Sequence, residues 1–576
     1  MSVRMMALAL IVALGPALPA AAAPPMMKWQ DEQGRWHYGD RPPQAGARAD
    51  ALLETGQDAA AAKEYETWAK MGDARAQTKL GELYLEGRGV SRDEAKAREL
   101  FGIAAGNGYA EARFRLGDLL ATGRGGALDL PGAVRWYRQA AEGGHAGAQG
   151  RYGTALVDGQ GVARDVAQGL QWLMRGAEAG DADAEYRLGL CYLRGEGVLG
   201  DPRTAVEWFR RAATRGQPGA AQQLAELAAS GRVPGLELAE VMPGLVRAAE
   251  SGFPPAQLSL GLIHLQGLTG TQNLALAVRW LGAAAEAREP LAQFTLAGLY
   301  ANGEGVARDE RRAVQLYRGA AEAGHPRAQF ELAERLAKGA GVPRDDAEAV
   351  VWYARAAKQG LASAHTRLGE HYQRGRGIAA DLLLAVREYR AAAEAGHAPA
   401  QLALALLTRA GTGTERDPEL AVLWLRRAAD QGLGLAQVDL GLAYAEGSGV
   451  ARDDEQAARW YARAARAGYA PGRFLLGMAS LTGRGVQRDE AQAAVLLRAA
   501  AEQGYAPAQT AYGLLLRDGR GMPADPVAAW KWLDLAALDG DQVALQARET
   551  LAARLPPAQL QGLRRDARLW RPKTGP

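Results

Sequence analysis

The segment YANGEGVARDERRAVQLY, residues 300–317, decides the fold of this chain. Taken alone it has the features of a ligand loop, because a glycine-rich loop ahead of a helix can hold phosphate and acids around a glycine can hold calcium. Its first glycine, however, recurs every 36 residues in thirteen copies, at Gly87, Gly123, Gly159, Gly195, Gly231, Gly267, Gly303, Gly339, Gly375, Gly411, Gly447, Gly483 and Gly519. A catalytic loop does not occur thirteen times in one chain, so the loop is part of the architecture.

Each 36-residue unit is predicted to contain two helices. In the quoted copy the first helix is expected over residues 292–301, with Leu296 on its apolar face. The two glycines let the chain turn, and Asp309 stands where the second helix needs an N-cap. That helix is expected to stop at Gly324, a good left-handed C-cap; glycine holds this position in every copy except one, where Arg288 replaces it.

One position of the second helix is usually tryptophan. Such a row of aromatic rings can stack on ligands, but its regular return on the apolar face favours core packing. The alanine pairs and the Leu-Gly steps of the repeat predict that neighbouring helices approach closely. The tryptophans of this row are Trp136, Trp172, Trp208, Trp280, Trp352, Trp424, Trp460 and Trp532.

The repeat pattern A-x-x-x-L-G-x-x-Y-x-x-G-x-G-V-x-x-D-x-x-x-A-x-x-W-Y-x-x-A-A-x-x-G resembles the Sel-one-like repeat (SLR) family, relatives of the tetratricopeptide repeats. The resemblance implies an all-α, right-handed α/α superhelical solenoid with thirteen repeats over residues 76–543. It also implies a scaffold that binds proteins, with no catalytic residues and no cofactor. Cysteine-rich relatives join each helix pair by a disulfide, whereas this chain has Cys191 alone.

The N-terminal residues predict export. Arg4 precedes the apolar run Met5–Leu14, and a small-residue segment follows, as in a secretory signal peptide, here residues 1–22. The apolar run is too short for a membrane anchor, and no later stretch is expected to span a bilayer. We therefore expect a periplasmic protein, with secretion from the cell as the alternative.

Residues 23–50 predict a small aromatic β-hairpin module. The segment KWQDEQGRWHYGDRPP, residues 28–43, places Trp29 and Trp36 on either side of a turn. It resembles a short domain of unknown function that is common near the start of exported bacterial proteins. His37 and Asp40 supply only two candidate ligands, too few for a zinc site. The hairpin could instead recognise a glycan or a protein.

The ends of the repeat array are predicted to be capped, as solenoids require. Residues 51–75 supply a capping region with one helix at residues 59–70, and residues 544–576 supply closing helices, the last opened by Pro556-Pro557. Copies five and six depart most from the pattern, and Pro243 within a second helix should kink or shorten that helix. We therefore predict a change of superhelix direction near residues 231–275.

Composition excludes several functions. The chain has 576 residues with 68 basic and 65 acidic side chains, a balance that argues against nucleic acid as the main partner. One cysteine allows no internal disulfide. Of the seven histidines, His37 lies in the hairpin and the other six, including His145, His325 and His371, fall on ordinary repeat positions. No catalytic or metal-binding set stands outside the repeat pattern, so we expect no enzyme activity and no metal.

Binding residues are expected where the copies differ, on the first-helix face away from the core, at the equivalents of residues 79, 82 and 86. Early copies carry a basic stripe there, which could equally be an ordinary solvated face. Late copies carry an apolar stripe, which could mark a partner site or be buried by tight coiling. Besides a protein-binding scaffold of the cell envelope, a secreted factor for a host protein and a glycan or cell-wall binder remain open. The candidates are Lys79, Arg115, Arg151 and Arg187 in the basic stripe, Leu406, Leu442, Leu475, Met478 and Leu514 in the apolar stripe, and Trp29 and Trp36 in the hairpin.

Overall fold

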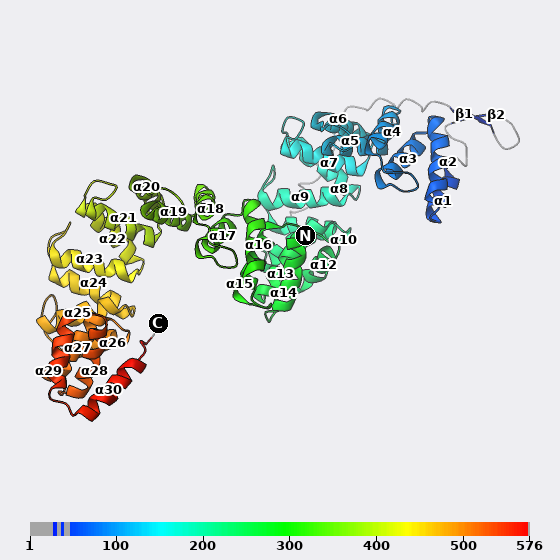
Figure 1. Cartoon of the computed structure of the whole chain (residues 1–576). Coiled ribbons are helices and arrows are strands. Elements are labelled where there is room, and N and C mark those ends of the chain that lie inside the picture. The colour runs from blue at the N-terminus through cyan, green and yellow to red at the C-terminus, as the bar shows by residue number, and fades with distance from the viewer. Residues whose placement is uncertain (1–26, 31–35, 40–45, 574–576) are drawn as a thin grey trace, which may run out of the picture. The chain divides into compact units, whose positions relative to one another are not determined.

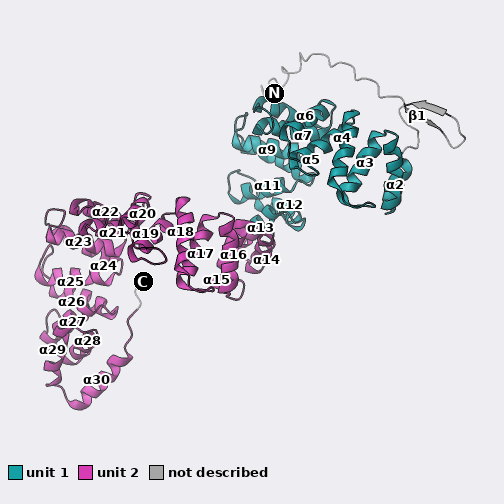
Figure 2. Ribbon diagram, turned by 45° about the horizontal axis from the view of Figure 1, so that its top comes forward, with its two compact units in different colours: residues 1–260 teal, residues 261–576 magenta. Residues whose placement is uncertain are grey.

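The structure is a computed structural model that describes residues 27–30, 36–39 and 46–573 of the chain (Figure 1). Apart from two short strands, its regular elements are α-helices arranged in pairs. The chain divides into two compact units, residues 1–260 (unit 1) and residues 261–576 (unit 2), as Figure 2 shows. The two strands, β1 (Met27–Gln30) and β2 (Trp36–Gly39), pair antiparallel, with Trp29 opposite His37.

The helices of unit 1 begin with two that precede the repeats. The repeats then occupy α3 to α12, and α13 crosses the boundary between the units. Their bounds are α1 (Ala47–Glu54), α2 (Asp58–Lys70), α3 (Ala74–Glu86), α4 (Glu94–Gly106), α5 (Ala110–Thr122), α6 (Leu130–Glu142), α7 (Ala146–Asp158), α8 (Val166–Glu178), α9 (Ala182–Arg194), α10 (Pro202–Thr214), α11 (Pro218–Ala229), α12 (Leu238–Glu250) and α13 (Pro254–Gln266).

Unit 2 continues the same pattern and ends with two helices that follow the repeats. Their bounds are α14 (Leu274–Glu286), α15 (Pro290–Asn302), α16 (Glu310–Glu322), α17 (Pro326–Lys338), α18 (Asp346–Lys358), α19 (Ala362–Arg374), α20 (Leu382–Glu394), α21 (Ala398–Ala410), α22 (Pro418–Asp430), α23 (Gly434–Glu446), α24 (Asp454–Arg466), α25 (Ala470–Thr482), α26 (Glu490–Glu502), α27 (Ala506–Asp518), α28 (Pro526–Leu538), α29 (Gln542–Ala552) and α30 (Pro557–Leu569).

Helices α3 to α28 form thirteen pairs, which confirms the helix-pair repeat predicted from the sequence. In the quoted copy, Gly303 adopts φ 76° and its amide donates to the Leu299 carbonyl at 2.9 Å, ending α15. The Asp309 carboxylate accepts from the Arg312 amide at 3.0 Å and caps α16, as predicted. The right-handed sense of the superhelix stays a prediction.

The second loop glycine also meets the preceding repeat. Gly305 has φ 71°, and a Cβ there would lie 2.6 Å from the Cβ of Leu274 at the start of α14. Glycine is therefore needed twice over, for the left-handed backbone and for the close approach of successive copies. The glycines of this loop therefore allow successive repeats to stack closely.

The Leu-Gly step of the first helix makes room for an aromatic or leucine side chain of the second helix. A Cβ on Gly117 would lie 2.5 Å from the Tyr137 ring, and one on Gly189 would lie 2.4 Å from the Phe209 ring. Ala104 and Ala105 are fully buried, as the alanine pairs predicted. The core therefore depends on small residues that admit large ones, in keeping with dense interior packing.

A recurring side chain satisfies the carbonyl groups at the end of each preceding helix. Gln77 donates from Nε2 to the Ala69 carbonyl at 3.0 Å, and Gln437 donates to the Ala429 carbonyl at 3.1 Å. The last carbonyls of a helix lack partners within it, so these amides stabilise the helix ends. The same bond recurs from Gln149, Gln257, Gln293, Gln329, Gln401 and Gln509.

The tryptophan row is only partly core, which corrects the sequence interpretation. Trp280, Trp352, Trp424 and Trp460 are buried, but the other four rings are half-buried. In five copies an arginine three residues later covers the ring; for example, the Arg355 guanidinium lies 4.4 Å from the Trp352 ring centroid. Such cation–π contacts cover a ring face that would otherwise meet water. The half-buried members are Trp136, Trp172, Trp208 and Trp532.

The irregular copy lies where it was predicted. Helix α11 has 12 residues and ends at Ser230 in a right-handed conformation, whereas first helices elsewhere end at a left-handed glycine such as Gly303. Pro243 lies inside α12, yet α12 keeps 13 residues, so of the two predicted effects Pro243 does not shorten the helix, and the kink stays a prediction. The boundary between the units, at residue 260, falls within residues 231–275. The change of superhelix direction stays a prediction.

Both ends of the array carry extra helices. Helix α2 matches the predicted cap at residues 59–70, but α1 precedes it, so the cap is not a lone helix. Asp50 of α1 pairs with Arg75 of α3 at 2.6 Å and accepts a hydrogen bond from Tyr65 of α2. At the other end α30 starts at Pro557, and Lys573 beyond it pairs with Glu502 at 2.8 Å.

Several predictions fall on residues outside the described part of the chain. These are the signal peptide, residues 1–22, the hairpin turn at residues 31–35 and the candidate ligand Asp40. The hairpin module as a whole, residues 23–50, therefore stays a prediction, and so does recognition by Trp29 and Trp36. The observed strands and their antiparallel register agree with the alternation from which the hairpin was predicted.

Candidate binding groove

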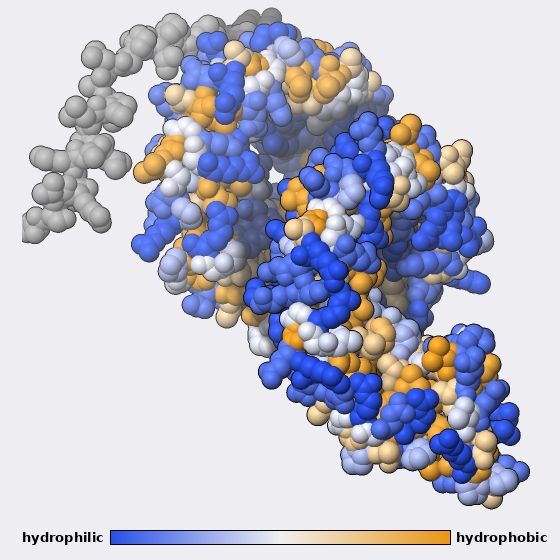
Figure 3. Space-filling model, turned by 90° about the vertical axis from the view of Figure 1, so that its left-hand side faces the viewer, coloured by the Kyte–Doolittle hydropathy of each residue, from blue (hydrophilic) through white to orange (hydrophobic). Residues whose placement is uncertain are grey.

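Three cavities are lined by residues of the first helices, and the same positions of the repeat line all three. Their volumes are about 460, 350 and 340 Å³. Each is lined by equivalents of residues 79 and 82, the positions that the helical period placed opposite the core. We call this surface the groove face and define it by those two positions of each first helix. The space-filling view in Figure 3 shows apolar patches scattered among polar and charged surface.

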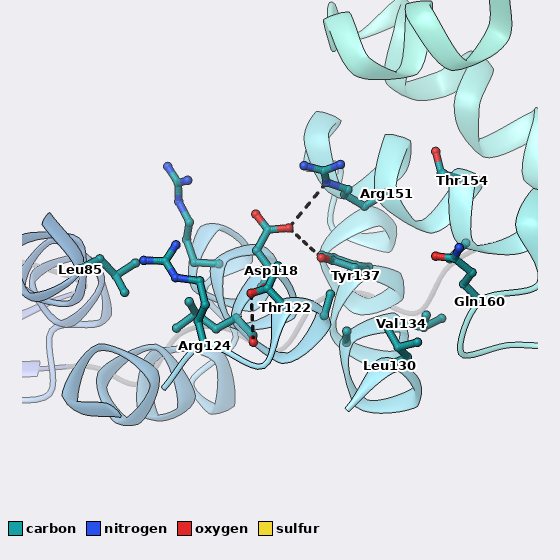
Figure 4. Close-up of a pocket in the computed structure, with 15 residues that line it drawn as sticks. Leu85, Asp118, Thr122, Arg124, Leu130, Val134, Tyr137, Arg151, Thr154 and Gln160 are labelled. Atoms are coloured by element: carbon teal, nitrogen blue, oxygen red, sulfur yellow. Dashed lines mark hydrogen bonds and ion pairs between the residues drawn. The ribbon is translucent and has the colours of Figure 1, made fainter. Parts of the chain in front are cut away.

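The cavity of unit 1 has polar and charged side chains at the groove-face positions, with apolar residues such as Leu130 and Val134 elsewhere in its lining. Asp118 of α5 lies between Tyr137 of α6 and Arg151 of α7, as Figure 4 shows. The Tyr137 hydroxyl donates to Asp118 Oδ1 at 2.7 Å, and Arg151 Nε lies 3.6 Å from the same oxygen. Burial, together with the Asp118 carboxylate, raises the pKa of Tyr137 well above its ordinary range. The hydroxyl is therefore a hydrogen-bond donor at any physiological pH.

The predicted basic stripe is paired with acids throughout. Lys79 Nζ lies 2.9 Å from Glu82 Oε2, and Arg115 Nη2 lies 3.3 Å from Glu82 Oε1. Arg151 lies close to Asp118, and these two residues have the same 33-residue spacing as Arg115 and Glu82. Glycan or anion capture by these residues would have to displace those carboxylates. The partners of the four basic residues are Glu82, Glu111, Asp118, Asp158, Asp183 and Glu196.

Arg187 differs from the other members of the stripe because it is buried. Its guanidinium Nη2 lies 2.9 Å from Glu196 Oε2 and also pairs with Asp158. Beside it, Cys191 is fully buried, and burial raises the pKa of the thiol to about 11. Arg187 thus joins the loop after α9 to the neighbouring first helix, which is a structural role.

The cavity between α17 and α19 is lined by charges of both signs. Glu334 Oε1 accepts from the Tyr353 hydroxyl at 2.7 Å and lies 2.8 Å from Arg367 Nε. Arg335 and Lys338 pair with neighbouring acids of α16 and α17. The arrangement repeats that of Asp118, with the charges of the cavity satisfied from within the chain.

The third cavity, between α23 and α25, is apolar in the same positions. Leu442, Leu475 and Met478 line it, with Glu446 and Arg484 among the polar residues around them. The structure thus brings three of the five predicted apolar residues into one cavity. Leu406 and Leu514 lie outside this cavity; like its three lining residues, they are partly buried and pack against the neighbouring core. Tight coiling does not bury the stripe within unit 2, because all five keep partial exposure.

One residue of this cavity was not predicted from the sequence. Tyr461 of α24 lines it and is 6 % exposed. Its equivalents Tyr137 and Tyr353 each donate to an acid 19 residues earlier, but the residue 19 before Tyr461 is Leu442. Among the described residues the Tyr461 hydroxyl makes no hydrogen bond. Burial raises the pKa of Tyr461 to about 12, so the hydroxyl is protonated at neutral pH.

The histidines serve the repeat fold. His325 Nδ1 accepts from the Ala328 amide at 3.1 Å and so caps α17, and His145 caps α7 in the same way. His371 and Cys191 are buried, as their repeat positions predicted. Within the described ranges, no group of three or more His, Cys, Asp or Glu side chains is placed to hold a metal ion.

Comparison with known proteins agrees with this repeat geometry. The family model of the Sel1 repeat matches twelve segments, at residues 74–109, 110–145, 146–181, 182–217, 254–288, 290–325, 326–361, 362–397, 398–433, 434–469, 470–505 and 506–541. The chain belongs to the Sel1 repeat family. The unmatched helix pair is α11 and α12, the copy that contains Pro243. A model of a domain of unknown function, DUF4124, matches residues 13–66 and confirms the N-terminal resemblance.

Solved structures include other Sel1 repeat proteins. A protective antigen of uropathogenic Escherichia coli with an SLR fold is 31% identical; the match covers 82% of this chain and 94% of that one, with a TM-score of 0.61. A Sel1 repeat protein of Oxalobacter formigenes is 32% identical and covers 54% of this chain and 90% of its own, with a TM-score of 0.47. No protein of curated function matches the chain. Sel1 repeats form protein-interaction scaffolds, and this chain is built as one.

Proposed function

We propose that this Sel1 repeat protein is an exported, non-catalytic scaffold of the bacterial cell envelope that binds a partner protein on its groove face. The observation that carries the proposal is the apolar cavity lined by Leu442, Leu475 and Met478. In the other two cavities most of the equivalent positions carry acids and bases that pair with one another. The three apolar side chains pack on the core with one side and stay partly exposed on the other, and exposed apolar patches are typical of partner sites.

Export is supported by the N-terminal sequence. Arg4, the apolar run Met5–Leu14 and the small residues after it suit a secretory signal. In the described part of the chain no helix is long and apolar enough to cross a membrane. The DUF4124 match begins within this segment, at residue 13, and runs to residue 66, in agreement with the N-terminal module expected of exported bacterial proteins.

A secreted factor that binds a host protein is the second candidate. One observation favours it: the similar E. coli structure is that of a protective antigen. Fractionation of cells and culture medium separates the two candidates, because a scaffold of the envelope stays with the cell. A chain found mainly in the medium would favour the secreted factor.

Photo-cross-linking in living cells tests the binding surface. A photoreactive amino acid replaces Leu442, which is partly exposed, and Trp460 and Val495 provide the controls. Trp460 lies in the adjacent helix and is buried, whereas Val495 is exposed and lies outside the three cavities. The proposal expects one discrete cross-linked protein from position 442 and none from either control. The same product from position 495, or none from position 442, would contradict it.

A further inference from the structure

The cavity between α23 and α25 has the size and lining of a side-chain pocket. Its volume of about 340 Å³ falls in the range of pockets that hold small ligands or large side chains. Leu442, Leu475 and Met478 supply apolar contact, and Met478 can adapt its shape because its side chain is unbranched. Ala457 and Ala479 leave the space open. The lining fits a bulky aliphatic side chain.

The Tyr461 hydroxyl adds a polar requirement to this apolar pocket. It belongs to a side chain more than nine-tenths buried, and in the described ranges it has no hydrogen-bond partner. The ring is buried, but the hydroxyl oxygen keeps access to the open cavity, where water can pair with it until a partner binds. Two other copies satisfy this hydroxyl with Asp118 or Glu334, but Leu442 offers no acceptor. An acceptor from outside the chain, such as a main-chain carbonyl, would take the place of that carboxylate.

Carboxylates without an ion pair flank the pocket. Glu446 lines it and is exposed, and Asp439 lies one turn before Leu442 on α23. Neither has an ion pair among the described residues, although Arg409 acts on Asp439 through space. Burial raises the pKa of Asp439, and the charge of Arg409 opposes this rise. Asp454, by contrast, already pairs with Arg484 at 2.9 Å.

We propose that this pocket binds a basic segment of the partner protein through one bulky aliphatic side chain, with the Tyr461 hydroxyl donating to a main-chain carbonyl of that segment. A lysine or arginine of the segment lies near Asp439 and Glu446. The proposal rests on the proposed function and names the chemistry of the bound segment. Apolar burial supplies the affinity, and the hydroxyl and the two carboxylates select the register of the segment.

Other copies of the repeat suggest a substitution that would fill the pocket and pair the Tyr461 hydroxyl. Since Asp118 and Glu334 satisfy the matched tyrosines, Leu442→Glu would supply Tyr461 with an internal acceptor and place a charge in the pocket. The substitution is compatible with the fold because another copy carries Glu334 at this position. The matched control is Thr154→Glu, at the equivalent position of unit 1. Circular dichroism and thermal melting verify that both variants remain folded.

The test selects random peptides displayed on phage against the full chain and measures the consensus peptide by fluorescence anisotropy. The proposal expects peptides with leucine, isoleucine or methionine next to lysine or arginine. Leu442→Glu should weaken binding by about tenfold or more, because it puts a charge where an aliphatic side chain would lie. Tyr461→Phe should weaken it by about three- to tenfold, the worth of one hydrogen bond. Thr154→Glu should leave binding unchanged.

Several results would overturn the proposal. These are no enrichment, acidic or wholly polar peptides, or equal binding to the Leu442→Glu and unchanged chains. Unchanged binding by Tyr461→Phe would show that the Tyr461 hydroxyl does not donate to the bound segment. Its failure is distinguishable from failure of the scaffold function. A discrete cross-link from position 442 in cells, together with failed peptide selection, would leave the scaffold and reject this pocket chemistry.

Discussion

Replacing Arg288 by glycine tests how strongly the helix ends control the stability of the repeats. Arg288 is the one non-glycine residue with positive φ among the described residues, at 63°. In the other copies this position is glycine with positive φ, as at Gly324 with φ 91°. The Arg288 side chain is exposed and makes no hydrogen bond or ion pair within the described ranges. The substitution therefore changes the backbone preference and removes no such contact.

The expected gain follows from two opposing terms. A left-handed conformation costs a residue with a Cβ about 1–2 kcal/mol, which glycine does not lose. The glycine substitution also gives the unfolded chain more freedom, which offsets about 0.4–1 kcal/mol of that gain. We expect Arg288→Gly to stabilise the α14–α15 connection by about 0.5–1 kcal/mol. Ala287→Gly is the matched control, because Ala287 has φ −74° and glycine there should destabilise.

Hydrogen exchange followed by mass spectrometry is the suitable assay, because a repeat array opens locally and its unfolding need not be two-state. Amides at the end of α14, such as those of Arg288 and Glu289, report on the connection directly. In Arg288→Gly they should exchange about two- to fivefold more slowly, and in Ala287→Gly they should exchange faster. Equal or faster exchange in Arg288→Gly would refute the claim that backbone strain is stored at this position.

Three further predictions concern the repeat and the groove. Gly305→Ala should lower the free energy of unfolding by about 3 kcal/mol, since a Cβ there clashes with Leu274. Gly324→Ala should lower it by about 1 kcal/mol, because its Cβ would meet open space. Urea unfolding of both variants compares the two losses. Burial, with Arg327 nearby, lowers the pKa of His325 below 6.5, so stability from its neutral cap is complete above pH 6.5 and declines as the pH falls below it. Aspartate caps the equivalent helix at Asp181, so the melting temperature of wild type should fall relative to that of His325→Asp as the pH is lowered from 7 to 5, and a pH-independent difference would contradict this. Tyr137→Phe should lower the free energy of unfolding by about 1 kcal/mol, because it removes a hydrogen bond to Asp118, while Tyr461→Phe should leave it unchanged. Equal losses of stability in the two variants would show that the Tyr461 hydroxyl is already paired within the chain.

The repeat was predictable because each signal occurs many times. Asp309, Gly303 and Gly305 act through local backbone chemistry, so their roles follow from spacing and residue type alone. Helix α1 was missed because its eight residues, Ala47–Glu54, are too few to show a clear period and are held by contacts from Asp50 to distant residues. Local patterns do not report such tertiary contacts.

The groove face was predictable in position but not in charge. The helical period placed Lys79, Arg115 and Leu442 on it, because residues three and four apart share a helix face. Arg115, however, pairs with Glu82 of the preceding copy, 33 residues earlier. Such pairs neutralise the stripe that was predicted to be basic. The 19-residue spacing from Asp118 to Tyr137 was also visible in the sequence; it is lost at Leu442 and also at Gly298, so the spacing alone does not identify the pocket.

The central claim is that the groove face of unit 2 binds a partner protein through the pocket at Leu442. The most direct measurement places the photoreactive amino acid at Leu475, on the opposite side of the pocket, in cells that carry either Leu442 or Leu442→Glu. The account predicts a discrete cross-linked protein with Leu442 and its loss with Leu442→Glu at equal levels of folded chain. A product of equal yield in both strains would contradict it.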